Sequence, residues 1–382
     1  MFGILSIVSF ESFIQKGVIP WPRPPRRIAL LTSGGDCAGL NAIIRAVVLR
    51  AEALNWEVIG ILNGTHGLMY DPPQIMTLRT ADVDTVMMRQ GGTILGTTNK
   101  GDPFAYPMPD GSLEDRSWQI IENFQTLRCD ALVGIGGDGS LAILHRLAQQ
   151  GGLPLIGVPK TIDNDVSVTE ASIGFDTAVA VATEALDRLQ PTAASHDRIM
   201  VLEVMGRDAG HIALAAAIAG GADVVLIPEI PYDLANVVSH IQEIRRSGRN
   251  FALVVVSEGV PTPDGPAVKS PLFGGEMRLG GIGHVIGSRI ADMCQAETRV
   301  TVLGHVQRGG HPSAQDRVMA AAFGVHAVDL IRDGKAGRMV AWSDRCVIDV
   351  KIEDIVARPH KVDARGSLVR TARGLGICLG DA

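Results

Sequence analysis

The stretch RIALLTSGGDCAGLNAIIRAVVLRAEAL, residues 27–54, predicts a strand, a glycine turn and a helix in immediate succession. Residues 28–31 are continuously apolar, which is typical of a strand buried on both faces of a parallel sheet. From Leu40 onward the apolar residues recur at helical spacing. A strand followed directly by a helix is the repeating unit of parallel sheets that are covered by helices. These residues therefore predict an α/β fold.

The same alternation continues along the chain and starts afresh near Ala171. In the first half, strands are predicted within residues 56–64, 129–136 and 153–161, with a helix over 141–150. In the second half, helices are predicted over 175–189, 211–222, 234–246 and 283–296, and strands over 198–206, 223–229, 251–259 and 298–303. The Pro- and Gly-rich stretch 261–281 predicts a loop. The pattern indicates two α/β units.

Composition and charge exclude several classes of protein. The 382 residues are 46% hydrophobic, and the net charge of −6 argues against nucleic acid as a partner. We predict no membrane segment, because no apolar run is long enough to span a bilayer. Five scattered cysteines without a CxxC pair indicate reduced thiols and a cytoplasmic location. Residues 1–26 form a predicted N-terminal extension; disorder and a start placed upstream of the true one both remain open.

Glycines follow two of the predicted strands, as they do where a backbone approaches a phosphate. Gly34 and Gly35 stand between the first strand and its helix, where phosphate binding and a plain tight turn are both open. The motif GIGGDGS, residues 134–140, places Asp138 among three glycines. A lone carboxylate beside phosphates is suited to Mg²⁺, which keeps few protein ligands. An ordinary aspartate in a glycine turn is the alternative.

The motif PKTIDND, residues 159–165, follows another predicted strand and contains two carboxylates. Phosphoryl transfer requires positioning, charge neutralisation and a group that accepts the proton of the nucleophile. Asp163 or Asp165 could be that base, and an Asx turn is the alternative explanation.

Arginines accompany glycine turns at two further strand ends. Arg207 lies in EVMGRDAG and Arg308 in LGHVQRGG, and both suit bidentate recognition of phosphate. The neighbouring basic residues are His305, beside these turns, and Arg198 and Arg299, which precede predicted strands. In open α/β sheets ligands bind at the carboxyl ends of strands. The set favours a phosphotransferase acting on a small phosphorylated substrate.

Seven motifs, in this order and spacing, resemble the 6-phosphofructokinase family over about residues 27–340. They are TSGGDCAGLNA, GGTILGTTNKGDPF, GIGGDGS, PKTIDNDV, GFDTA, EVMGRDAGHIALAAAIAGG and LGHVQRGGHPSAQDR. The resemblance implies two Rossmann-like α/β/α sandwich domains with the active site in the cleft between them. It implies a donor-binding domain of 27–174 plus 307–357, and a fructose 6-phosphate domain of 175–306 plus 358–382.

The resemblance also implies a reaction and its residues. The family transfers a phosphoryl group to the 1-hydroxyl of fructose 6-phosphate. Position by position, Asp163 would be the general base, with Asp165 and Thr161 supporting base and phosphate, and Arg207 would stabilise the transition state. Asp138 would bind Mg²⁺. The donor site would contain Gly35, Asn99, Lys100, Gly137, Asp138, Gly139 and Ser140. The sugar-phosphate site would contain Thr161, Ile162, Asp163, Arg198, Met205, Gly206, Arg207, Glu258, Arg299, His305, Val306, Gln307 and Arg308.

A homo-oligomer, dimer or tetramer, is implied as well. In the family, the residues at the positions of Arg198 and Arg299 reach the site of a neighbouring subunit. Of the arginines that bind an effector nucleotide in the allosteric bacterial type, only Arg45 clearly remains, whereas Leu49 and Gln190 fill two other positions. Effector regulation is therefore open.

The phosphoryl donor depends on two residues. Lys160 is typical of the pyrophosphate-using branch, but that branch pairs it with an aspartate where this chain has Gly139. A side chain at 139 would occupy the volume of the α-phosphate of a nucleotide, whereas a lysine is long enough to swing aside. We therefore predict ATP as the donor, with pyrophosphate as the alternative. NAD kinases and lipid kinases share the GGDG turn but lack the other motifs, and a non-catalytic subunit is disfavoured because Asp138 and Asp163 are both present.

Overall fold

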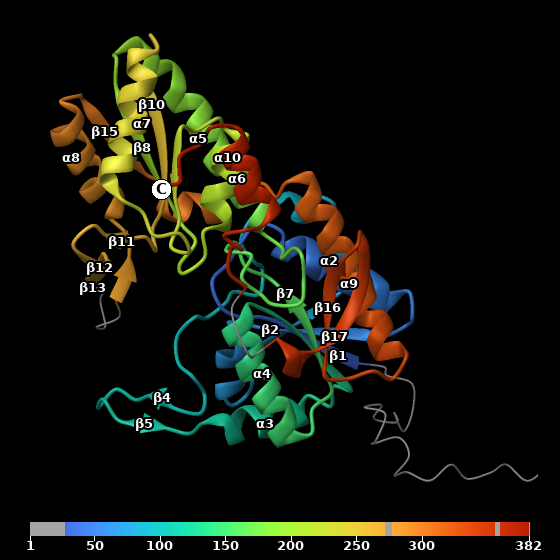
Figure 1. Cartoon of the computed structure of the whole chain (residues 1–382). Coiled ribbons are helices and arrows are strands. Elements are labelled where there is room, and N and C mark those ends of the chain that lie inside the picture. Colours follow the sequence, from blue (N-terminus) through green and yellow to red (C-terminus); the bar gives the residue numbers. More distant parts are fainter. Residues whose placement is uncertain (1–26, 272–276, 356–359, 382) are drawn as a thin grey trace, which may run out of the picture. The chain divides into compact units, whose positions relative to one another are not determined.

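A computed structural model describes residues 27–271, 277–355 and 360–381 of the chain (Figure 1). The described residues form two compact units, and the predicted N-terminal extension, 1–26, lies outside the described residues. The first unit comprises 27–161, 166–173 and 314–355, and the second comprises 162–165, 174–271, 277–313 and 360–381. The units thus divide at 313/314, whereas we predicted a boundary at 306/307. Residues 162–165 belong to the second unit, whereas we predicted them in the donor-binding domain.

A seven-stranded sheet is the centre of the first unit. Its order is β17-β16-β7-β6-β1-β2-β3. The bounds are β1 Arg27–Thr32, β2 Glu57–Ile61, β3 Ile75–Leu78, β6 Ala131–Gly136, β7 Leu155–Pro159, β16 Arg338–Ser343 and β17 Cys346–Lys351. The five inner strands pair in parallel, and β3 and β17 add antiparallel edges. The continuously apolar residues 28–31 are fully buried, as predicted, and lie in β1, an inner strand of this sheet.

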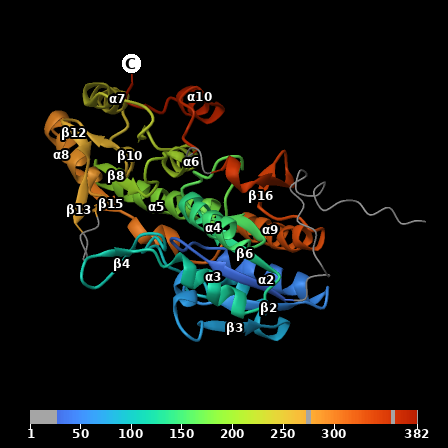
Figure 2. The ribbon, with the colours of Figure 1, turned by 90° about the horizontal axis from the view of Figure 1, so that it is seen from below.

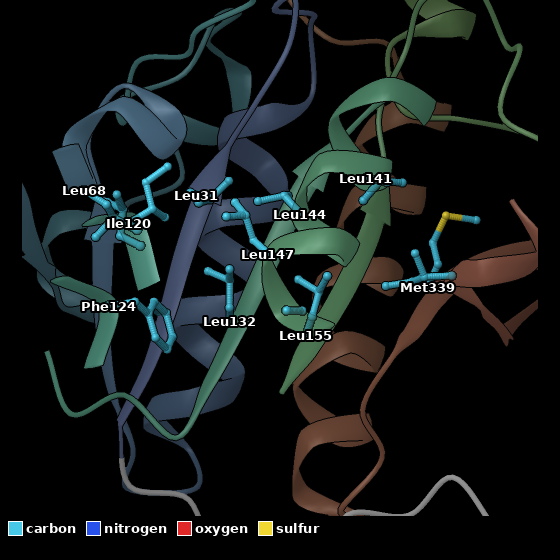
Figure 3. Packing of buried hydrophobic residues seen from close by; sticks show 14 of the residues in the cluster. Leu31, Leu68, Ile120, Phe124, Leu132, Leu141, Leu144, Leu147, Leu155 and Met339 are labelled. Atoms are coloured by element: carbon cyan, nitrogen blue, oxygen red, sulfur yellow. The ribbon is translucent and has the colours of Figure 1, made fainter. Parts of the chain in front are cut away.

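Helices cover this sheet and fill its core. They are α2 Leu40–Glu52, α3 Ser117–Thr126, α4 Asp138–Gly151 and α9 Ala314–Arg332. α2 and α9 lie side by side (Figures 1 and 2). Beneath α4, Leu144 and Leu147 pack with Leu132 of β6 and Phe124 of α3 in one buried cluster (Figure 3). Burying each such side chain contributes about 1.5–3 kcal/mol, so this cluster fixes α4, and with it the GIGGDGS motif, on the sheet.

The second unit has a four-stranded parallel sheet of order β15-β8-β10-β9. Its strands are β8 Ile199–Val204, β9 Val224–Leu226, β10 Ala252–Ser257 and β15 Thr298–Val302. Its helices are α5 Phe175–Ser195, α6 His211–Ala219, α7 Leu234–Arg246, α8 Ile282–Cys294 and α10 Ser367–Gly374. The prediction of two α/β units is confirmed.

Short 3-10 turns and hairpins complete the described chain. The turns are η1 Gly64–Met69, η2 Thr80–Asp82, η3 Met87–Arg89, η4 Gly304–Arg308 and η5 Ile352–Asp354. β4 Tyr106–Pro107 and β5 Leu113–Glu114 form a small antiparallel pair. In the described part of the chain, no helix combines the length and apolar character needed to cross a membrane.

The stretch 261–281 is not the plain loop that its composition predicted. β11 Pro261–Thr262 pairs with β12 Gly265–Ala267, and β13 Lys269–Pro271 pairs with β14 Met277–Leu279. Each of these strands has one partner strand only, so half of its N–H groups face away from the pair and form no inter-strand hydrogen bond. Proline, which has no N–H, is tolerated at such positions. Residues 272–276 lie outside the described residues.

Candidate active site

The predicted site residues divide between the two units. Those expected to bind the donor, together with Lys160 and Thr161, belong to the first unit, and the chain enters the second unit at Ile162. The expected base Asp163 and the residues expected to bind the sugar phosphate, except Thr161, belong to the second unit. The two groups of residues are therefore described separately.

In the first unit, two glycine turns lie side by side because β1 and β6 are neighbouring parallel strands. Ser33 at the end of β1 donates from its N–H to the carbonyl of Ile135, at 2.8 Å. Gly34 has φ of 82°, and a Cβ on it would lie 2.9 Å from the Ser140 hydroxyl oxygen. Glycine is therefore required both by the backbone conformation and by the close approach of Ser140.

The segment before Asn99 and Lys100 is tied to the first of these turns. The Gly34 N–H donates to the carbonyl of Thr98 at 2.9 Å, and the Thr97 hydroxyl donates to the carbonyl of Gly34 at 2.6 Å. Asn99 and Lys100 follow directly and are exposed. The predicted donor residues on both sides of the turn are thus brought together, with their side chains available to a ligand.

The last three residues of the GIGGDGS motif form the start of a helix, whereas we predicted a glycine turn. α4 begins at Asp138, so Asp138, Gly139 and Ser140 are its first helical residues and only Gly137 precedes them as N-cap. The first N–H groups of a helix have no partner within it, and its dipole favours an anion there. A Cβ on Gly139 would meet no atom within 4 Å. The first turn of α4 therefore offers N–H donors, a carboxylate and open space to a phosphate.

Lys160 does not lie in that open space. Its side chain is buried, only 3% of the residue is exposed, and its ammonium donates to the carbonyl of Gly35. Its N–H donates to the carbonyl of Gly136 at 2.9 Å. The ammonium lies beside the first glycine turn because the apolar strand β7 ends at Pro159, directly before it. Lys160 thus supplies a fixed positive charge beneath this turn.

In the second unit, the expected base Asp163 lies beside Arg207. Asp163 is 3% exposed, and its carboxylate lies 4.0 Å from the guanidinium of Arg207. Burial, and secondly the negative charge of Asp165, raise the pKa of Asp163 to about 6, while Arg308 and Arg207 act in the opposite direction. A carboxylate with a pKa near neutrality is suited to accept a proton in catalysis. Asn164, directly after Asp163, has positive φ, and so do Gly206 and Arg207 itself.

Buried polar side chains hold the turn that carries Arg207. Glu258 accepts from the N–H of Gly206 at 3.4 Å and of Arg207 at 3.2 Å. Gln307 accepts from the N–H of Met205 at 2.8 Å. These bonds join the ends of β8 and β10 to the turn η4, as expected where ligands bind at the carboxyl ends of parallel strands.

A cavity of about 300 Å³ in the second unit is lined in part by Met205 and Glu258. It is lined by Glu203, Val204, Met205, Glu258, Leu279, Gly280, Gly281, His284, Val302 and Gly304. Sequence reasoning missed Glu203 and His284. Glu203 accepts from the N–H of Gly281 at 2.8 Å and of Gly283 at 2.7 Å, where α8 begins. The sequence feature that could have indicated Glu203 is a single carboxylate within the apolar strand IMVLEV.

Comparison with known proteins shows the family of the chain. A model of the family described as phosphofructokinase matches residues 27–331. The chain belongs to the phosphofructokinase family. It is 60% identical over 356 residues to ATP-dependent 6-phosphofructokinase 1 of a Nostoc species, covering 93% of this chain and 99% of that protein. A Synechocystis protein with the same name is also 60% identical, with the same coverage.

A solved phosphofructokinase structure shares the fold. The Saccharomyces cerevisiae enzyme matches with a TM-score of 0.74 and 28% identity, over 87% of this chain. The match covers 44% of the yeast chain, so this chain spans less than half the length of that relative. The predicted α/β fold class and the family resemblance are both confirmed.

The remaining predicted site residues of the chain lie near strand ends. Arg198 directly precedes β8, but Arg299 is the second residue of β15 rather than preceding the strand. Both guanidinium groups pair with Glu297, that of Arg198 at 3.0 Å. His305, Val306, Gln307 and Arg308 belong to η4, where the predicted glycine turn is a 3-10 turn, and Val306 is exposed. A contact of Arg198 or Arg299 with another subunit stays a prediction.

Proposed function

We propose that this chain is an ATP-dependent 6-phosphofructokinase, a glycolytic transferase. It transfers the γ-phosphoryl group of ATP to the 1-hydroxyl of fructose 6-phosphate, which gives ADP and fructose 1,6-bisphosphate. The observation that carries the reaction is the buried Asp163 carboxylate beside Arg207, with its pKa raised to about 6. The names of the relatives that are 60% identical support ATP as donor.

The proposed role of Asp163 is to accept the proton of the sugar hydroxyl. With a pKa of about 6, the carboxylate is about nine-tenths ionised at pH 7, so it is ready to act as a base. Arg207 carries donors that suit the charge developing on the transferred phosphoryl group. We assign the sugar phosphate to Met205, Gly206, Glu258, His305 and Arg308, because the first three surround the Arg207 turn and the last two follow β15.

Kinases of this type use a divalent metal, and we propose Mg²⁺ held by Asp138. The described residues contain no cluster of three metal-binding side chains, which fits an ion held by one carboxylate together with phosphate oxygens and water. Asp138 is half-buried at the start of α4, next to the open space beside Gly139. When bound, the ion neutralises charge on the phosphates.

We assign the donor to the first unit, with Gly35, Asn99, Lys100, 137–140 and Thr161 around it. Gly139 leaves room for a nucleotide, whereas Lys160 is engaged with Gly35 and does not enter that room. We therefore infer that Lys160 is compatible with ATP. A homo-oligomer in which Arg198 and Arg299 reach a neighbouring subunit, and a cytoplasmic location, are retained as proposals.

The test is a donor-competition assay. Initial rates are measured with fructose 6-phosphate and MgCl₂, given ATP, pyrophosphate or both. We expect fructose 1,6-bisphosphate with ATP and a rate at least tenfold lower with pyrophosphate alone. Turnover with pyrophosphate but not ATP would reverse the donor assignment. An absence of turnover with either donor would favour a non-catalytic subunit.

A further inference from the structure

A segment near the C-terminus contacts the loop that carries the proposed base. The N–H of His360 donates to the carbonyl of Asp165 at 2.7 Å, although the two residues are far apart in sequence. Both residues belong to the second unit. The loop 162–165 contains Asn164 in the left-handed region, with φ of 53°. Asparagine is one of the few non-glycine residues that adopt this conformation, and contacts from outside the loop help to hold it.

The segment 360–362 is itself held at two points. The ring Nε2 of His211 lies 3.1 Å from the carbonyl oxygen of His360, and the two rings stack with centroids 5.0 Å apart. Two residues further on, the N–H of Val362 donates to the carboxylate of Glu229 at 2.9 Å. The ring of Phe175 packs edge-on against His211. His211 and Glu229 thus both anchor the segment whose N–H bonds to Asp165.

The same two anchors also fix the turn that carries Arg207. Glu229 accepts from the N–H of Gly210 at 3.0 Å, and Gly210 is the N-cap of α6, whose first residue is His211. The Ala209 N–H donates to the carbonyl of Gly206 at 2.9 Å, which closes the turn around Arg207. The segment 360–362 therefore bridges the base loop on one side and the arginine turn on the other.

We propose that residues 360–362 act as a clasp that sets the position of Asp163 relative to Arg207, with His211 as its positioning residue. The proposal rests on the proposed function, because it takes Asp163 and Arg207 as the reacting groups. The distance that the clasp maintains is the 4.0 Å between their carboxylate and guanidinium. Misplacing a catalytic group by about 1 Å can reduce the rate on the order of a hundredfold, so a remote tie of this kind has a measurable effect.

The clasp does not depend on the charge of His211. Burial lowers the pKa of His211 below its ordinary value, whereas the hydrogen bond to the carbonyl of His360 raises it, as do the charges of Glu229 and Asp165. A neutral imidazole with its proton on Nε2 still donates to the carbonyl of His360, and a protonated one does so as well. We therefore expect the clasp to persist across the working pH range.

The experiment compares three substitutions of His211 in the full-length enzyme. His211→Gln keeps a side-chain N–H donor, His211→Phe keeps an aromatic ring without a donor, and His211→Ala removes both. His240→Ala is the matched control, because His240 lies on α7 of the same unit and is partly exposed. The measurements are kcat, the KM for fructose 6-phosphate, the pH dependence of kcat, and the amide exchange of residues 161–166.

We expect His211→Phe and His211→Ala to lower kcat about tenfold or more and to raise amide exchange in 161–166. The acid limb of the kcat profile should move below pH 6 in these variants, because a loosened loop exposes Asp163 to water. His211→Gln should recover most of kcat, and His240→Ala should behave as the unmodified enzyme.

Unchanged kcat and acid limb in His211→Phe would overturn the clasp, as would a His211→Gln variant no better than His211→Phe. If a variant is too unstable for kinetics, unchanged exchange of 161–166 in the folded fraction also overturns it. Asp163→Asn, assayed in parallel, separates the two proposals. If Asp163→Asn remains active, the assignment of the base is wrong, whereas an inactive Asp163→Asn beside a fully active His211→Phe refutes only the clasp.

Discussion

We expect the ionised carboxylate of Asp163 to lower the free energy of unfolding, although the proposed reaction needs it. The stability of the Asp163→Asn variant tests the size of this effect. The carboxyl is buried and its pKa is raised from an ordinary 3.8 to about 6, so the folded protein binds this proton more tightly than the unfolded chain does. Stability therefore falls as pH rises from the unfolded value toward the folded one. With about 1.36 kcal/mol per unit, the full difference is about 3 kcal/mol above pH 6.

Asparagine has nearly the same shape and carries no charge at any pH. We expect Asp163→Asn to unfold with a free energy about 3 kcal/mol higher than the unmodified enzyme at pH 8, and about half of that at pH 5. The assay is urea unfolding of both proteins at these two pH values, at one protein concentration because a homo-oligomer would couple stability to concentration. The same variant should lose nearly all kcat.

Two results would refute this reasoning. One is an Asp163→Asn variant that is less stable than the unmodified enzyme at pH 8, because then the ionised carboxylate stabilises the fold. The other is a stability difference that is equal at pH 5 and pH 8, because the gain would not come from ionisation. Asp187→Asn on the helix α5 is the control, since Asp187 is exposed.

Three further predictions follow from the same contacts. The acid limb of the pH profile of kcat should lie near pH 6. Asp165→Asn should move this limb to lower pH by less than about one unit, because burial is the larger cause of the raised pKa of Asp163. An acid limb at the same pH in this variant would contradict the role of Asp165. Gly139→Asp should lower kcat/KM for ATP at least tenfold with little change in thermal stability. A Cβ at position 139 meets no atom within 4 Å, and an acidic residue suits the first turn of a helix. Gly139→Ala is the control, and unchanged ATP kinetics in Gly139→Asp would refute the steric argument. Gly206→Ala should lower the free energy of unfolding in urea by about 1–3 kcal/mol. The φ of Gly206 is 154°, and a new Cβ would lie 2.5 Å from the carbonyl oxygen of Ala209. An unfolding curve equal to that of the unmodified enzyme would contradict this prediction.

Lys160 illustrates how far a motif can be interpreted without coordinates. Its position after an apolar strand was visible in the sequence, and so was its charge. Its direction was not, because a lysine side chain has four rotatable bonds and its contacts come from other elements. The fold turns it toward Gly35, a residue 125 positions earlier in the chain, and no atom of it lies within 4 Å of a Cβ placed on Gly139.

Local pattern determined much of this protein. The apolar runs of β1, β6, β8 and β10 and the helical spacing after Leu40 predicted the elements, because side-chain periodicity follows directly from backbone geometry. Composition alone failed at 261–281, where short strands with a single partner tolerate proline. The start of α4 at Asp138 was also missed, because glycine after an aspartate resembles a turn until packing of Leu144 and Leu147 extends the helix.

By itself, the sequence determined the α/β class, the family and the identity of the polar residues at the strand ends. Only the tertiary structure decided which of these residues meet and in what electrostatic state. The raised pKa of Asp163, its approach to Arg207 and the tie of Asp165 to His360 all join segments that are distant in the chain. Burial and charge interactions depend on distance in space, and the spacing of residues along a sequence does not contain that distance.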